Sequence, residues 1–124
     1  MLNPVPEPEM PFVMKEYVPR VVQKTKQNWY LIIPMEARPP ESRKGRVMIE
    51  FTIQPDGKVT DMTLIGPSGD IALDRAAWAA IKESQPYASF GKSLTVPYLK
   101  LHFLFLYNEK PESEKTSEGA KPQQ

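Results

Sequence analysis

Residues 45–65 have the sequence GRVMIEFTIQPDGKVTDMTLI, which combines a strand pattern with a strong turn signal. Apolar side chains stand at every second position over residues 47–53, as expected for a strand with one buried face. The Pro-Asp-Gly turn at 55–57 supplies the backbone freedom of a tight reversal. The apolar positions of the second segment, 58–65, change phase near Thr60, which indicates a bulge. The stretch therefore predicts an antiparallel hairpin.

Helical patterns lie on both sides of this hairpin, and a third strand pattern follows. Apolar residues within 17–30 fall on one side of a helix, and Pro19, tolerated only in a first turn, places the helix start near 16–18. A second helix is predicted over 70–84, with the aspartate at its first position as the cap. The most apolar segment, 96–107, predicts a third, long strand.

The order of these elements is helix, strand, strand, helix, strand, which predicts an α+β fold. A right-handed crossover through the second helix places the third strand beside the first and antiparallel to it. The expected sheet is therefore three-stranded and antiparallel, in the order second, first, third, with both helices packed on one face. On this layout the third strand forms an edge of the sheet.

The two ends of the chain differ from its middle in composition. Fourteen of the 124 residues are proline, and the closely spaced prolines of residues 1–16 favour the extended backbone of a linker. Residues 109–124 are charged and hold no large apolar side chain, so we expect a disordered tail there. The folded domain is therefore expected at 17–108. No apolar run approaches the ~20 residues that cross a bilayer.

Charge and residue usage argue against several classes of function. The formal net charge is +1, so the positive field of a nucleic-acid-binding protein is missing and no nucleic acid is expected as a partner. The absence of cysteine excludes disulfides, thiolate nucleophiles and cysteine-based zinc sites. The single histidine, His102, leaves catalytic triads and imidazole-rich metal sites incomplete. We therefore expect no enzyme, no catalytic residue, no metal and no cofactor.

A hydrolytic or metal site could be drawn only from four aspartates. They are Asp56, Asp61, Asp70 and Asp74. Structural roles account for all four: Asp56 lies in a turn, Asp61 in an exposed bulge, Asp70 at a helix cap and Asp74 in the first turn of a helix.

Other polar and aromatic residues also have a structural and a functional interpretation. His102 is expected to make a cross-strand polar contact rather than to act in catalysis. Trp29 is expected to pack in the core, whereas Trp78 lies off the apolar stripe of its helix and a ligand-stacking role stays open. The basic group at 43–46 is expected to form a solvated loop, with contact to anionic lipid or a receptor rim as the alternative.

Several motifs in a fixed order resemble one known family. They are GRVMIEFTI at 45–53, PDGKV at 55–59, SG at 68–69, LDRAAWAAI at 73–81, NWY at 28–30 and PMEA at 34–37. Together they resemble the C-terminal domain of TonB-family energy transducers, and the likeness covers about residues 17–107. Two departures concern loops. The connector at 31–44 is longer than usual, and Ser89-Phe90-Gly91 stands where the family has a second proline shortly after Pro86.

The resemblance implies a periplasmic domain of a Gram-negative envelope protein, anchored to the inner membrane. A proline-rich linker and a preceding membrane helix would connect it to an inner-membrane motor complex driven by the proton-motive force. The implied partner is the Ton box, a short extended segment of outer-membrane receptors, and the implied role is force transfer during substrate uptake. A TolA-like envelope scaffold without a transport role is the alternative.

An edge strand offers a physical basis for such binding, because its unpaired backbone groups can form a ladder with an incoming extended peptide. The third strand is therefore the candidate binding surface. Its candidate residues are Tyr98, Lys100, Leu101, His102, Phe103, Leu104, Phe105 and Leu106. Leu104 and Leu106 could pack against the added peptide, or instead cover a second apolar layer or a homodimer contact.

Overall fold

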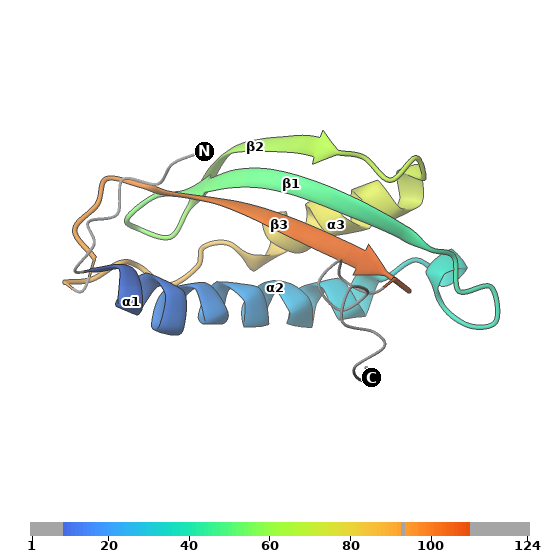
Figure 1. Ribbon diagram of the computed structural model, residues 1–124, viewed down its shortest axis with the longest axis horizontal. Helices are drawn as coiled ribbons and strands as arrows, with labels where there is room; N and C mark the ends of the chain where they lie inside the picture. The colour runs from blue at the N-terminus through green and yellow to red at the C-terminus, as the bar shows by residue number, and fades with distance from the viewer. Residues whose placement is uncertain (1–8, 93, 110–124) are drawn as a thin grey trace, which may run out of the picture.

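The computed structural model, which describes residues 9–92 and 94–109, contains a three-stranded antiparallel sheet. Its strands are β1 (Gly45–Ile53), β2 (Val59–Gly66) and β3 (Leu99–Tyr107), in the order β2-β1-β3. The helices α2 (Val18–Ile32) and α3 (Ile71–Ser84) pack together on one face of the sheet (Figure 1). The predicted α+β class, element order and strand order are confirmed.

The first helix begins earlier than the predicted start near residues 16–18. Helical structure starts at α1 (Met10–Phe12), inside the segment predicted as linker, and passes through a π-helical turn, η2 (Val13–Tyr17), into α2. Pro19 lacks the N–H group that would bond the carbonyl of the preceding turn, and the wider π turn lies directly before it. The prediction was wrong because it took this proline for the start of the helix.

The rest of the predicted division into linker, domain and tail stays a prediction. Residues 1–8 and 110–124, which hold most of both predicted flanks, lie outside the described residues.

The β1–β2 hairpin contains the predicted bulge. Glu50 pairs with Thr63 and Thr52 with Thr60, so two residues of β2 stand opposite one residue of β1. Asp61 lies in this bulge with a φ of 52°. The backbone therefore changes its twist at the position where the apolar pattern changes phase.

The turn of the hairpin is joined to the loop that follows α3. Gly57 has a φ of 91°, and its carbonyl accepts the N–H of Tyr87 at 2.8 Å. The N–H of Phe90 donates to the carbonyl of Pro55 at 2.9 Å. A Cβ atom on Gly57 would lie 1.9 Å from the Tyr87 carbonyl oxygen, so the close approach requires glycine.

The core lies between the sheet and the helices, and the alternate residues of β1 provide its centre. Val47, Ile49, Phe51 and Ile53 are all fully buried. Trp29 packs edge-on against Phe105 and Tyr107, with ring centroids 5.1 and 5.0 Å away. This confirms the packing role predicted for Trp29.

A hydrogen-bonded chain crosses the same part of the core. Trp29 Nε1 donates to the Tyr107 hydroxyl at 2.9 Å, and that hydroxyl donates to the Leu73 carbonyl at 2.8 Å. The chain ties α2, β3 and α3 together. Burial also raises the pKa of Tyr107 to about 12.

Three of the four aspartates have the structural partners expected of turns and helix starts. Asp56 accepts the N–H of Lys58, and Asp70 accepts the N–H of Ala72 as the cap of α3, both at 3.0 Å. Asp74 accepts the Ser68 hydroxyl at 2.8 Å. Across the described residues no three His, Cys, Asp or Glu side chains are grouped closely enough to hold a metal ion.

Hydrogen bonds and ion pairs hold the connector between α2 and β1 in place. It contains a short 3₁₀ helix, η3 (Met35–Ala37). Asn108 Nδ2 donates to the carbonyls of Ala37 and Arg43 at 2.8 Å. Arg43 forms 2.8 Å ion pairs with Glu41 and with the capping Asp70, and its guanidinium lowers the pKa of Asp70. The basic loop is thus partly exposed and ion-paired.

Candidate functional site

The candidate site is the free edge of β3. This strand pairs with β1 over its whole length, from Leu99 opposite Ile53 to Tyr107 opposite Gly45. Within residues 9–92 and 94–109, no strand pairs with its other edge. The backbone N–H and C=O groups on that side are therefore available to a further strand.

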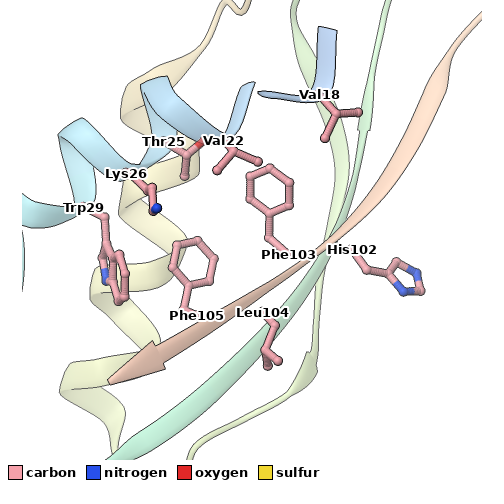
Figure 2. A pocket seen from close by; sticks show the side chains of 9 residues that line it. All are labelled: Val18, Val22, Thr25, Lys26, Trp29, His102, Phe103, Leu104 and Phe105. Carbon is pink, nitrogen blue, oxygen red and sulfur yellow. The ribbon is translucent and has the colours of Figure 1, made fainter. Parts of the chain in front are cut away.

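Side chains of β3 alternate between the helix-covered face and the open face of the sheet. Phe103 and Phe105 point toward α2, whereas His102 and Leu104 point away from it (Figure 2). Leu104 is 42% exposed, the largest exposure of an apolar side chain on β3. The alternation predicted from the sequence is confirmed.

A groove of about 330 Å³ runs between α2 and the free edge of β3. Its lining is mostly apolar, with one cationic side chain from α2. The residues are Val18, Val22, Thr25, Lys26 and Trp29 of α2 and His102, Phe103, Leu104 and Phe105 of β3 (Figure 2). An extended segment added to β3 would place every second side chain in this groove.

The open face of the sheet beside β3 is more polar. His102 Nε2 lies 2.8 Å from Glu50 Oε2, directly across the β1–β3 pair, and this hydrogen bond lowers the pKa of Glu50. The cross-strand polar contact predicted for His102 is thus confirmed. Leu104 also lines a shallow hollow of about 230 Å³ with Met48 and Gly66, where β2 ends. Alternate side chains of an added strand would lie beside His102 and Leu104.

The predicted binding residues do not all lie together. Four of them, the run 102–105, line the groove. Tyr98 precedes the first residue of β3 and lines a separate polar hollow with Lys100 and Asp61. Leu101 and Leu106 are half-buried in the strand.

The wall of the site is provided by α2 and was not predicted from the sequence. Val18 and Val22 were assigned to the apolar stripe of a core helix, and they are only half-buried because they lie beside an open edge. Lys26 follows Val22 by four residues and so stands on the same side of the helix. The four-residue spacing of these residues was the sequence signal for the wall. It indicates a groove only when the helix is known to border the edge strand.

The site holds the groups of a binding surface. It offers a strand edge that no described strand pairs with, aromatic and aliphatic side chains, and one lysine. Among the helices that the structure describes, none is long and apolar enough to cross a membrane.

Comparison with solved structures finds similar chains at low sequence identity. Two solution structures of the TonB C-terminal domain of Helicobacter pylori are similar, one at 21% identity over 84% of this chain and 95% of that one, with a TM-score of 0.48. The other is 26% identical over 73% of this chain and 97% of that one, also with a TM-score of 0.48. TolAIII bound to a peptide from the N-terminus of TolB matches at 21% identity over 79% and 77% of the two chains, with a TM-score of 0.49.

No curated protein matches the chain. A family model does, that of the Gram-negative bacterial TonB protein C-terminal domain, and it matches residues 34–106, more than half of the chain. This match covers the hairpin, α3 and nearly all of β3. The chain therefore belongs to the family of TonB C-terminal domains.

Proposed function

We propose that this domain binds the Ton box of outer-membrane receptors by adding it as a strand to the free edge of β3. The observation that carries the proposal is that none of the described strands pairs with this edge of the nine-residue strand β3, which also borders an apolar groove. Main-chain hydrogen bonds would supply much of the affinity, and the groove would hold alternate side chains of the peptide. No catalytic group is needed for this role.

The proposed setting is the periplasm, with an inner-membrane anchor preceding the chain and a motor complex that pulls on it. A peptide paired along β3 is loaded along the strand direction, so many ladder bonds resist the pull together. A complex of moderate equilibrium affinity could therefore transmit force for a short time. This would couple the proton-motive force to substrate uptake through the receptor.

The same edge would serve a TolA-like scaffold, which binds other periplasmic proteins without driving uptake. It would also serve a second copy of this chain, paired edge to edge. A binding experiment with defined peptides separates these uses.

Heteronuclear NMR of the labelled domain with a synthetic Ton-box peptide tests the proposal. We expect amide shifts along β3 and along the facing side of α2. The matched control is the same peptide N-methylated at alternate residues. One alternate set should abolish binding, because its N–H groups form the ladder, and the other set should not. Equal binding by both methylated peptides would contradict strand addition.

A peptide from the N-terminus of TolB is the second probe. Shifts along β3 with this peptide, and none with any Ton-box peptide, would favour the TolA-like scaffold. Self-association that disappears when peptide is added would show that a second copy competes for the same edge.

A further inference from the structure

We infer that Lys26 makes the groove selective for an acidic side chain at one position of the added peptide. This inference rests on the proposed function, because it assumes that an extended segment pairs with β3. It concerns which segment the edge prefers.

The spacing along α2 matches that of an extended strand. Val18, Val22 and Lys26 lie four residues apart, so each is about 6 Å further along the helix axis than the last. Alternate residues of a strand are about 6.6 Å apart. In Figure 1 α2 and β3 run in the same general direction, so three successive groove-facing side chains would meet these three residues in turn.

The three positions differ in chemistry. Val18 and Val22, opposite Phe103, form an apolar section, and Lys26 stands between Val22 and Trp29 near the other end of the groove (Figure 2). The expected peptide therefore carries two apolar residues at alternate positions and a carboxylate at the next alternate position.

Lys26 is the polar group of the groove that remains available. The hydroxyl of Thr25 already donates to the Val21 carbonyl at 2.7 Å and lies 2.6 Å from the Tyr87 hydroxyl. The Nε2 atom of His102 is held by Glu50. In the described part of the chain the side chain of Lys26 forms no hydrogen bond or ion pair.

The charges around the groove favour an anionic partner. From Val18 to Ile32, helix α2 carries Arg20, Lys24 and Lys26 and no acidic residue. Lys24 donates to the Pro86 carbonyl at 2.8 Å, and Arg20 lines a separate hollow with Lys24 and Pro86, so both are directed away from the groove. No carboxylate lines the groove in the described residues. A peptide carboxylate would therefore meet Lys26 with aromatic rings on either side.

Titration calorimetry with three synthetic peptides tests the inference. Each is a strand of alternating valine and threonine flanked by serines, with one end valine of the groove-facing set replaced by Glu, Gln or Lys. Both ends are tested, because the direction of the added strand fixes which one meets Lys26. We expect the Glu peptide to bind about two- to fivefold more tightly than the Gln peptide, and the Lys peptide to bind most weakly.

Substitutions of Lys26 distinguish an ion pair from a general charge effect. Lys26→Gln should remove the preference for Glu over Gln, and Lys26→Glu should reverse it toward the Lys peptide. Lys82→Gln, which changes the net charge equally but lies on α3, should keep the wild-type order. A preference that survives Lys26→Gln would overturn the inference.

The two proposals fail in different ways. If the Glu and Gln peptides bind equally and both shift the β3 amides, Lys26 does not select the partner, while strand addition stands. If no peptide of the set, nor any Ton-box peptide, shifts the β3 amides, strand addition itself fails.

Discussion

At the scale of single residues, Gly57 is the described glycine at which an added Cβ atom would make the closest contact. Its φ of 91° disfavours a side chain, and a Cβ atom would lie 1.9 Å from the Tyr87 carbonyl oxygen. We expect Gly57→Ala to lower the free energy of unfolding by about 2–4 kcal/mol, measured by urea denaturation.

Gly69 provides the matched control for this substitution. It has nearly the same φ, 92°, but a Cβ atom added there would meet no other atom within 4 Å, so Gly69→Ala should cost only about 1–2 kcal/mol of backbone strain. Equal losses for the two variants would show that contact with the Tyr87 loop contributes nothing.

Tyr107 is the residue on which the buried hydrogen-bonded chain depends. Tyr107→Phe would remove the acceptor of the Trp29 N–H and the hydroxyl that donates to the Leu73 carbonyl. Because both groups are buried, we expect a loss of about 1–3 kcal/mol in the free energy of unfolding. Tyr30→Phe, at a ring that is 54% exposed, should change it by less than about 0.5 kcal/mol. An unchanged free energy of unfolding in Tyr107→Phe would mean that water replaces the hydroxyl.

At the scale of elements, period-2 and period-3.6 patterns were sufficient to predict most of the fold. The β1–β2 hairpin and its bulge followed from the phase of apolar residues, and α3 followed from its cap and stripe. The prediction of the first helix start was wrong because it used the preference of proline for the first helical turn, which describes local geometry. The burial of Val13 is instead set by tertiary contacts. The role of α2 as the wall of the groove was not predicted for the same reason. An apolar stripe shows which side of a helix is covered, but not which element covers it.

The early helix start leads to a test of the predicted domain boundary at residue 17. Val13 is 3% exposed, and Met14 beside it is 59% exposed. Val13→Ala should therefore lower the free energy of unfolding by about 1–3 kcal/mol, whereas Met14→Ala should change it by less than about 0.5 kcal/mol.

A chain that begins at residue 17 should lose at least as much stability as Val13→Ala, because it lacks the whole first turn. Full stability of this shortened chain in urea denaturation would restore the predicted boundary and show that the contacts of Val13 are dispensable.

At the scale of the whole molecule, the sheet has one face covered by helices and one face open, so buried ionisable groups lie on the helix side. The Tyr17 hydroxyl donates to the Ala88 carbonyl at 2.7 Å, and the Tyr107 hydroxyl joins α2 to α3. Burial raises the pKa of both phenols from 10.0 to about 12. Each phenol is thus kept neutral in the folded state.

These raised pKa values predict how stability depends on alkaline pH. Below pH 10 both phenols are protonated in the folded and the unfolded chain, so their contribution is fully present. Between about pH 10 and 12 the unfolded chain loses protons that the folded chain keeps, and the free energy of unfolding falls by at most about 1.4 kcal/mol per pH unit for each phenol. Urea denaturation across this range measures the slope. Tyr17→Phe should remove the contribution of one phenol from this slope, even though it also lowers stability at neutral pH. An unchanged slope would show that Tyr17 ionises alike in the folded and the unfolded chain.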